Sequence, residues 1–500
     1  MTPPSESAHR PGTEHASDAE PTPESLDRRA LWRVDSVGPI DGRYRRDTEA
    51  LAEYFSEHAL MEYRVRVESE YFLALHEEPA LGLEPLTEEE VAAVRELGTL
   101  AAEDAHLIKQ IEVRGHDGNP ATKHDVKAVE YFMKHRLAGK LPPEKLEWVH
   151  FGLTSEDVNN MAYALMLRDA TNRVMLPEAT NVLNALEEQA ERYADLPMLA
   201  RTHGQPASPT TLGKEFRVFA ERFGRQLGQI ERQTLQVKLN GATGNYNAHL
   251  AAFPEFDWEG FAERFVRRAS DANSGVRLEL NYVTTQIESH DSYAELFDAM
   301  RRLNTVLLDF DQDMWRYISD GWLVERPEDG ATGSSTMPHK VNPINFENSE
   351  GNIGIANALF EHFGRKLPVS RLQRDLSDST VERNFGVAFA HSLVAYKNTL
   401  KGLAKVEANG PKIEGVLEAH PEVVAEAIQT VLRSYGVERP YELLKEATRG
   451  REVTQEILDE LVDSLDLPED RRAYLKGFKP REYVGIAAKL ARGEAGETAT

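Results

Sequence analysis

A long stripe of apolar side chains between Tyr293 and Tyr317 is the feature of this sequence that most restricts its fold. Large apolar residues recur there in alternating steps of three and four, at Tyr293, Leu296, Met300, Leu303, Leu307, Phe310, Met314 and Tyr317. This spacing places them along one face of an α-helix, as in a coiled-coil seam. At about 1.5 Å per residue, the helix spans roughly 40 Å. Such a long apolar face predicts a bundle in which other helices cover it.

A second stripe of the same kind is predicted to run from Leu212 to Val237. Its positions are Leu212, Phe216, Phe219, Phe223, Leu227, Ile230, Thr234 and Val237, and Gly241 follows as a candidate C-cap. Strand-like alternation is scarce elsewhere, so the sequence predicts an all-α protein. Two long seams need partners, and bundles of this length usually find some of them in other subunits. We therefore expect a homo-oligomer.

Breaks in the helical pattern divide the chain into a tail and three predicted domains. Residues 1–30 are rich in Pro, Ser, Thr, Glu and Asp with almost no large apolar side chains, so we expect a disordered N-terminal tail. An N-terminal helical domain is predicted for 31–143, where Leu141-Pro142-Pro143 breaks a helix. The long helices form a central bundle domain at 144–403, and 404–500 form a C-terminal helical domain that ends in a polar tail.

Composition excludes several classes of function. A formal net charge of -25 opposes binding to nucleic acid or to an anionic membrane, because neutralising phosphates requires a basic face. The chain has no cysteine, so disulfides and thiolate chemistry are impossible, and a reducing cytoplasm is the compartment we expect. No apolar run approaches the length that spans a bilayer, and the N-terminus lacks the order of a signal peptide. An anionic substrate would need a local basic pocket.

The segment Gly333-Ser334-Ser335-Thr336-Met337-Pro338-His339-Lys340-Val341-Asn342-Pro343 is predicted to be a mobile loop that ends in a fixed turn. Apolar residues from Phe346 to Phe363 then recur at helical spacing, so Lys340 and Asn342 lie just before a helix N-terminus. Unpaired N–H groups and the helix dipole favour an anion there, and we expect a carboxylate. A phosphate-binding P-loop does not fit, because no glycine immediately precedes Lys340 and no strand pattern leads into the segment.

Two polar segments before the second stripe are further candidates for a site. Arg201-Thr202-His203-Gly204-Gln205-Pro206 interrupts two predicted helices and presents His203 on an exposed turn, where an imidazole can donate a proton near neutral pH. The alternative is an ordinary surface histidine. Thr154 and Asp157 are spaced as a capping box that opens a helix, and the hydroxyls of Thr154 and Ser155 would also cradle an anion.

Arginines supply the candidates for binding a phosphate. Arg371, Arg374 and Arg383, with Ser379 and Thr380 between them, are the best such group in so acidic a chain, because guanidinium groups match phosphate oxygens. Arg43 and Tyr44, after Gly42, are a second candidate. The alternative for all of these arginines is a solvated charged surface.

Neither a metal nor a cofactor is expected. The sequence contains no HExxH motif and no cysteine, and His339 adjoins Lys340, whose charge opposes a cation. No GxGxxG motif follows a strand pattern, so a dinucleotide is not expected either.

The segment GSSTMPHKVNP resembles the signature loop of the fumarase/aspartase superfamily of lyases, and its continuation INFENSEGN resembles the adenylosuccinate lyase family. The similarity runs from Val37 to about Tyr483 and includes DGRY at 41–44, HDVKAVEY at 124–131, TSED at 154–157, RTHGQP at 201–206 and TQIE at 285–288. It implies an all-α homotetramer with each active site assembled from three subunits. The alternatives are another lyase of the superfamily, such as argininosuccinate lyase or an aspartase, and a helical oligomer with a structural role.

The resemblance also implies an activity, the reversible elimination of fumarate from adenylosuccinate to give AMP, and from SAICAR to give AICAR in purine synthesis. In that reaction Ser334 is the base, with Ser335 as the fallback, His203 is the general acid, and Lys340 and Asn342 bind the carboxylate. No metal is needed if fixed donors hold the developing charge. The resemblance assigns substrate binding to Arg43, Tyr44, His124, Asp125, Thr154, Ser155, Gln286, Asn348, Arg374, Ser379, Thr380 and Arg383.

Two features depart from the family's pattern. The family often has Asn before the His-Asp pair, where this chain has Lys123. The stretch at 113–120 is longer than usual, as a surface insertion would be.

Overall fold

The computed structural model describes residues 36–270, 275–326, 341–448, 453–476 and 478–494. The chain divides into two compact units, Met1–Glu49 and Ala50–Thr500. In the first unit Tyr44 precedes the short helix α2 (Arg45–Thr48). The Thr48 hydroxyl lies 3.1 Å from the Tyr44 carbonyl oxygen and 3.2 Å from that of Ile40, so it closes the turn that carries Arg43 and Tyr44.

The second unit is built mainly of helices, as the sequence predicts. Its N-terminal part follows η1 (Glu49–Leu51), which spans the boundary between the units, and comprises α3 (Ala52–Phe55), α4 (Glu57–His76), η2 (Pro79–Leu81), α5 (Glu88–Glu96), α6 (Ala102–Val113), α7 (Asp125–Leu137) and α8 (Pro143–Leu146). The central helices are α9 (Ser155–Ala170), the π-helical η3 (Thr171–Met175), α10 (Leu176–Arg192), α11 (Leu212–Glu231), α12 (Asn247–Ala252), α13 (Trp258–Ala269), α14 (Asp291–Ser319), α15 (Ile344–Lys366), α16 (Ser377–Glu382) and α17 (Phe385–Leu403). The C-terminal part comprises α18 (Gly410–Glu418), η4 (Pro421–Val424), α19 (Ala425–Ser434), α20 (Pro440–Thr448), α21 (Gln455–Asp463), α22 (Glu469–Lys476), η5 (Pro480–Glu482) and α23 (Ala487–Ala491).

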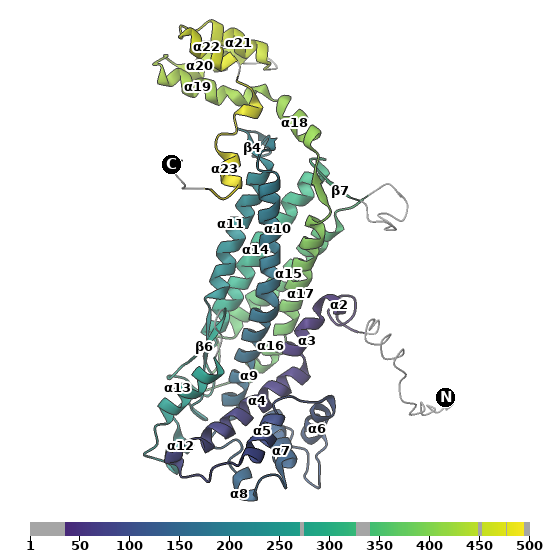
Figure 1. Ribbon diagram of the computed structural model, residues 1–500, viewed down its shortest axis with the longest axis vertical. Coiled ribbons are helices and arrows are strands. Elements are labelled where there is room, and N and C mark those ends of the chain that lie inside the picture. The colour runs from purple at the N-terminus through teal and green to yellow at the C-terminus, as the bar shows by residue number, and fades with distance from the viewer. Residues whose placement is uncertain (1–35, 271–274, 327–340, 449–452, 477, 495–500) are drawn as a thin grey trace, which may run out of the picture. The chain divides into compact units, whose positions relative to one another are not determined.

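The long helices α10, α11, α14, α15 and α17 run side by side at the centre of the second unit (Figure 1). The stripe that predicts α14 is buried from Tyr293 to Met314, and Tyr317 is half-buried. Burying each large apolar side chain stabilises the fold by about 1.5–3 kcal/mol. The stripe that starts at Phe346 is also buried along α15, which begins at Ile344. Both long-helix predictions are confirmed.

A polar side chain lies within this apolar bundle, and both its nitrogen and its oxygen are hydrogen-bonded. Asn304 of α14 is completely buried, its amide nitrogen lies 2.9 Å from the Ser392 hydroxyl, and its amide oxygen accepts from the Tyr396 hydroxyl at 2.7 Å. An unsatisfied amide at this depth would cost on the order of 1–3 kcal/mol. Any sliding of α14 against α17 would break both bonds, so these contacts help to fix the register of the two helices.

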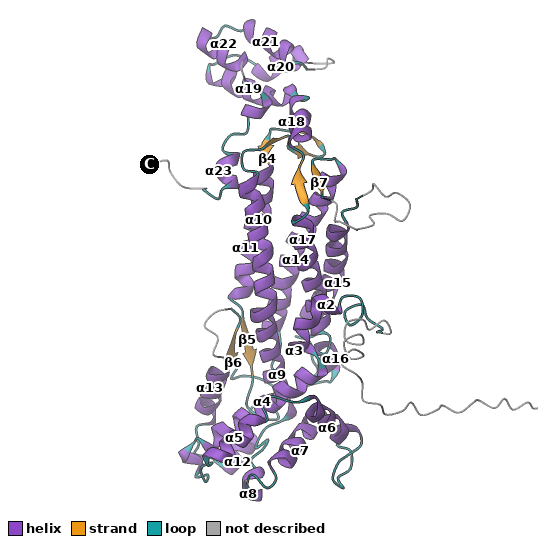
Figure 2. Ribbon diagram, turned by 45° about the vertical axis from the view of Figure 1, so that its right-hand side comes forward, coloured by secondary structure: helices purple, strands orange, loops and turns teal. Residues whose placement is uncertain are grey.

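The prediction that the second helical stripe continues to Val237 is wrong. Helix α11 ends at Glu231, and Thr234–Val237 form strand β5, which pairs in parallel with β6 (Arg277–Leu280) (Figure 2). Leu235 and Val237 are buried while Thr234 and Gln236 are half-buried, which is the alternation of a strand. Positions 234 and 237 continue the helical period by coincidence, and β-branched Thr234 and Val237 favour the extended form.

Short antiparallel strands complete the described elements. They pair β1 (Pro197–Met198) with β4 (Thr210–Thr211), β2 (Arg201–Thr202) with β3 (Gln205–Pro206), and β7 (Leu323–Glu325) with β8 (Val406–Ala408). None of the described helices has the length and apolar character needed to cross a membrane.

Separate apolar cores hold the N-terminal and C-terminal parts of the second unit. One core groups buried side chains between Met61 and Val149. Another groups side chains between Leu417 and Leu475, and it includes Leu199, which directly follows β1. The predicted domain boundaries at 143 and 403 stay a prediction.

Candidate active site

The predicted site residues of the second unit lie at opposite ends of its helical bundle. One set, called here the α9-end group, consists of His124, Asp125, Thr154, Ser155, Gln286, Arg374, Ser379, Thr380 and Arg383. The other, called the hairpin-end group, consists of His203, Asn342 and Asn348. From Ser155 to Arg192 the chain is one helical path through α9, η3 and α10, about 57 Å long at about 1.5 Å per residue. Ser334, Ser335 and Lys340 lie outside the described residues.

His203 sits at the tip of a tight hairpin at the C-terminal end of α10. Thr202 pairs with Gln205 across it, and His203 and Gly204 have φ values of 52° and 76°. Two successive left-handed residues are typical of a type I′ turn. The imidazole is exposed, and it has no hydrogen-bond partner among the described residues. The prediction of an exposed, rigid turn is confirmed, and the ring is available to a group from outside the chain.

Asn342 and Asn348 belong to the same end of the bundle as this hairpin. The Asn342 carbonyl accepts from the first N–H of α15, Ile344, at 2.7 Å, so Asn342 does lie just before a helix N-terminus. The Asn348 side chain accepts from Asn352 at 3.0 Å. Nearby, the guanidinium of Arg201 lies 5.7 Å from the ring centre of Trp322, which follows α14.

His124, Thr154 and Ser155 line a common cavity of about 350 Å³ at the other end of the bundle. His124 is the N-cap of α7, and its Nδ1 accepts from the Lys127 N–H at 3.3 Å. Because Nδ1 is the acceptor, the neutral ring carries its proton on Nε2, which can donate to a ligand. The cavity therefore offers hydroxyls and an imidazole N–H, which are donors suited to a carboxylate.

His150 also lines this cavity, and sequence reasoning missed it. Its Nδ1 contacts the fully buried carboxylate of Glu68. Burial lowers the pKa of His150, but the carboxylates of Glu68, Glu130 and Asp157 together raise it by more, so the net pKa is raised. The sequence signal that could have found His150 was its place four residues before Thr154. In the structure it lies on a turn with a φ of 63°.

Asp157 anchors the start of α9 from two sides. Its Oδ2 accepts from the Thr154 N–H at 2.8 Å, which confirms the predicted capping arrangement. Its Oδ1 lies 2.7 Å from the Lys238 Nζ and accepts from the Asn240 N–H at 3.0 Å. The side chains of Asp157 and Lys238 are both completely buried. The hydroxyl-bearing turn is thus held by a carboxylate that cannot move without leaving a buried charge unpaired.

The segment that carries Gln286 is joined to this anchor. The Asn240 side chain donates to the Thr284 hydroxyl at 2.9 Å, and Gln286, two residues further on, is half-buried. The structure therefore brings Gln286 to the same end of the bundle as Thr154.

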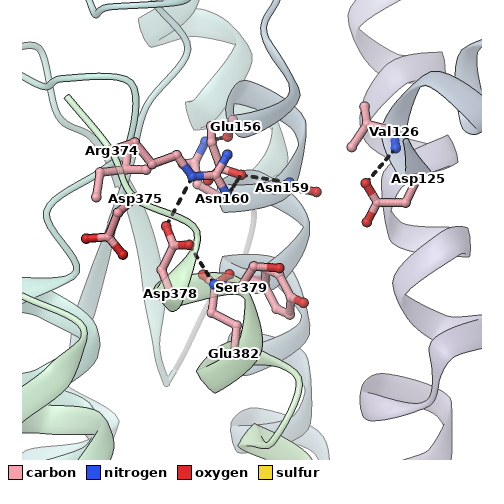
Figure 3. A network of polar contacts seen from close by, with 12 residues as sticks. Asp125, Val126, Glu156, Asn159, Asn160, Arg374, Asp375, Asp378, Ser379 and Glu382 are labelled. Carbon is pink, nitrogen blue, oxygen red and sulfur yellow. Dashed lines mark hydrogen bonds and ion pairs between the residues drawn. The ribbon is translucent and has the colours of Figure 1, made fainter. Parts of the chain in front are cut away.

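Arg374 lies between two carboxylates (Figure 3). Its guanidinium is 2.9 Å from Glu156 and 3.3 Å from Asp378, and its side chain is only 10% exposed. Burial and the nearby charge of Glu382 raise the pKa of Glu156 to about 7, against the smaller opposing effect of Arg374. Arg374 therefore ties the α16 region to α9, and sequence reasoning missed both of its acidic partners.

Arg383 is more accessible than Arg374. Its side chain is 48% exposed, and it shares the carboxylate of Asp125 with Arg64, at 3.1 Å and 2.8 Å respectively. Burial raises the pKa of Asp125, but Arg64, the Val126 N–H and Arg383 together lower it by more, so the net pKa is lowered and Asp125 is held ionised. By contrast, Arg371 is exposed and pairs only with Asp375, at 3.4 Å, among the described residues.

Ser379 and Thr380 lie in α16, between Arg374 and Arg383. The Ser379 N–H donates to Asp378 at 2.6 Å, and the Thr380 carbonyl accepts from Asn384 at 2.9 Å. The structure brings both residues to the α9 end of the bundle.

The departure at Lys123 has a local physical consequence. Lys123 has a φ of 50°, in the left-handed region that Asn adopts more readily than Lys. Its N–H donates to the Glu112 carbonyl at 2.9 Å, so the turn that leads into His124 is kept despite the substitution.

Comparison with known proteins gives matches over nearly the whole chain. Residues 42–356 match a family model described as lyase, and residues 370–484 match one described as adenylosuccinate lyase C-terminal. The chain is 48% identical to the adenylosuccinate lyase of Vibrio cholerae over 92% of this chain and 99% of that protein. It is 46% identical to the adenylosuccinate lyase of Escherichia coli, over 92% and 98%.

Solved structures show the same fold at low sequence identity. A fumarate lyase from Mesorhizobium has a TM-score of 0.69 at 19% identity and covers 89% of this chain and 97% of its own. The 3-carboxy-cis,cis-muconate lactonizing enzyme from Pseudomonas putida has a TM-score of 0.67 at 22% identity, over 89% and 96%. The predicted all-α fold of the fumarase/aspartase type is confirmed.

Proposed function

This chain belongs to the adenylosuccinate lyase family, and we propose that its active sites form where the α9-end group of one subunit meets the hairpin-end groups of others. The activity is that of a C–N lyase that releases fumarate from adenylosuccinate and leaves AMP. The observation that supports shared sites most strongly is the separation of about 57 Å along the helices between Ser155 and the base of the His203 hairpin.

The reaction needs one base and one acid. The base takes a proton from the carbon next to a carboxylate, the C–H electrons form the double bond of fumarate, the C–N bond breaks, and the acid protonates the departing nitrogen. We assign the base to Ser334 and the acid to His203. Its exposed imidazole, without a partner among the described residues, supports that role for His203. A serine hydroxyl needs neighbouring donors that favour its alkoxide, and Lys340 is the nearest cation in sequence.

The α9-end group supplies binding rather than proton transfer in this proposal. The cavity of His124, Thr154 and Ser155 holds a carboxylate of the succinyl group through hydroxyl and N–H donors. Gln286 contacts the base portion of the substrate. We assign the nucleotide phosphate mainly to Arg383 and only secondarily to Arg374, because Arg374 already has two carboxylate partners and is nearly buried.

The remaining assignments extend the same site. Lys340 and Asn342 bind the carboxylate beside the acidic carbon, and Asn348 faces the substrate. Arg43 and Tyr44 bind near the phosphate. We propose a homotetramer, SAICAR as a second substrate, and a cytoplasmic location that suits a chain without cysteine.

Fumarate release by the purified full chain tests the proposal. Adenylosuccinate and SAICAR should each give fumarate, while argininosuccinate gives none. Ser334→Ala should remove the activity and Ser335→Ala should retain most of it, with circular dichroism confirming that both variants fold. Release from argininosuccinate alone would contradict the substrate, and loss in Ser335→Ala alone would move the base to that residue.

A further inference from the structure

We propose that His116, Asp117 and His135 bind a divalent transition-metal ion of the zinc type. The three side chains meet on the N-terminal part of the second unit, and none belongs to the substrate-binding residues assigned above. The sequence predicts no metal because the ligands have no recognised spacing; His135 lies on α7, and the other two residues lie in the stretch at 113–120. The structure brings them together.

A rigid hairpin presents two of the three ligands. The His116 N–H donates to the Asn119 carbonyl at 3.2 Å, and the Asn119 N–H donates to the His116 carbonyl at 2.9 Å. Between them Asp117 and Gly118 have φ values of 49° and 79°, typical of a type I′ turn. A Cβ at Gly115 would lie 2.1 Å from the Asn119 carbonyl oxygen, so the approach to the hairpin needs glycine. The carboxylate is therefore held by a constrained turn.

The ligand atoms already lie near coordinating distances. The Asp117 Oδ2 is 3.0 Å from the His135 Nδ1 and 3.4 Å from the His116 Nε2. All three ligand atoms fall within 4.8 Å of one another. Metal–ligand bonds of about 2.0–2.1 Å in a tetrahedron place neighbouring ligand atoms about 3.3 Å apart. Both distances to the Asp117 carboxylate therefore already match this spacing closely.

His116 supplies a second and independent indication of a ligand. Its Nε2 is buried and makes no hydrogen bond, although the Asp117 carboxylate is close. The rings of His116 and His135 pack edge to face, with their centres 4.7 Å apart at 84°. A buried ring nitrogen without a hydrogen bond is costly unless something else satisfies it, and a metal ion would do so.

The donor set selects the class of ion. Two imidazoles and one carboxylate suit Zn²⁺ and its transition-metal neighbours, whereas Mg²⁺ and Ca²⁺ prefer oxygen ligands. With three protein ligands, at least one coordination position is left for water. Coordination would fasten the hairpin to the last turn of α7, whose N-cap is His124. The ion would thus stabilise the connection between α6 and α7.

Zinc titration of the untagged full-length chain, stripped with a chelator that is then removed, tests the site. We expect one ion per chain from His116, Asp117 and His135. His116→Gln, His135→Gln and Asp117→Asn should each weaken zinc binding by more than about tenfold. Replacing even a residue that only hydrogen-bonds to a metal ligand typically lowers metal affinity by at least about that factor. Asn keeps the left-handed turn, so Asp117→Asn removes only the charge. His106→Gln, on an exposed face of α6, is the matched control and should bind as the parent does.

Thermal unfolding gives a readout that does not depend on activity. Zinc should raise the melting temperature of the parent and of His106→Gln, but not that of His135→Gln, because only a ligand that prefers the folded state stabilises it. The absence of saturable binding by the parent would overturn the proposal. So would an unchanged affinity in His116→Gln and His135→Gln, because the three side chains would then serve only to anchor the hairpin.

Discussion

The two ends of the helical bundle are built in opposite ways. At the α9 end, Thr154 and Ser155 sit on a turn whose anchor, Asp157, is buried with Lys238. At the hairpin end, His203 projects from an exposed two-residue turn. In the shared site proposed above, this difference means that substrate binding is preorganised within one chain, whereas the proton donor comes from another subunit.

Replacing the group at the exposed end should have the largest effect. We expect His203→Gln to lower kcat by about 10²–10⁴-fold, the usual contribution of a general acid, with little change in KM. Steady-state fumarate release measures both constants, and His106→Gln serves as the control histidine. A KM effect without a kcat effect would assign His203 to binding and remove the contrast between the two ends.

Replacing a buried group at the α9 end should instead reduce stability. We expect Lys238→Met to destabilise the fold by about 3–5 kcal/mol, because it leaves the Asp157 carboxylate buried and unpaired. Lys109→Met, which removes a surface ion pair with Glu57, should cost about 1 kcal/mol or less. Midpoints of urea unfolding compare the two variants. Equal midpoints would mean that the α9 end is not held more firmly than the surface.

Mixing inactive variants tests whether the two ends meet between subunits. We expect His203→Gln and His124→Gln to be nearly inactive alone. After joint unfolding and refolding, random assembly should restore about a quarter of the parental sites, because both native residues then come from different chains. Fumarate release per subunit measures the recovery, and each variant refolded alone is the control. Activity no higher than the sum of the two controls would contradict sites shared in this way.

A smaller effect should appear in the pH dependence of stability at the α9 end. The pKa of Glu156 is raised from 4.5 to about 7 in the folded chain. The stabilisation from its protonated form is therefore complete below pH 4.5 and is lost as the pH rises through about 7. The free energy of unfolding of Glu156→Gln should therefore rise relative to that of the parent by about 1–3 kcal/mol as the pH increases from 5 to 8. Urea unfolding at each pH checks this, with exposed Glu77→Gln as the control.

Features set by neighbours in sequence were predictable. The apolar period of α14, the capping arrangement at Thr154 and the breakers around His203 each depend on residues a few positions apart, and the structure agrees with them. The likeness of several motifs to one family supplied the activity, which spacing alone could not.

What escaped prediction depends on contacts between distant segments. The end of α11 is decided by β6, which gives Thr234–Val237 a strand partner that no local pattern reveals. The carboxylate neighbours of Arg374 come partly from α9, more than two hundred residues earlier in the chain. Likewise, His135 lies close to His116 and Asp117 only once α7 has packed. The spacing of these three residues in the sequence matches no known metal-binding motif.

The bond between Asp157 and Lys238 also has a consequence for the order of folding. The two residues are separated by 81 positions in sequence, so the turn before α9 cannot gain this anchor until the chain beyond β5 has been synthesised. Closing so long a loop costs entropy that local helix formation does not, which favours helices first and this contact later. A ribosome-bound chain that stops before Lys238 would have its α9 helix, but the turn that carries Thr154 and Ser155 would lack its anchor.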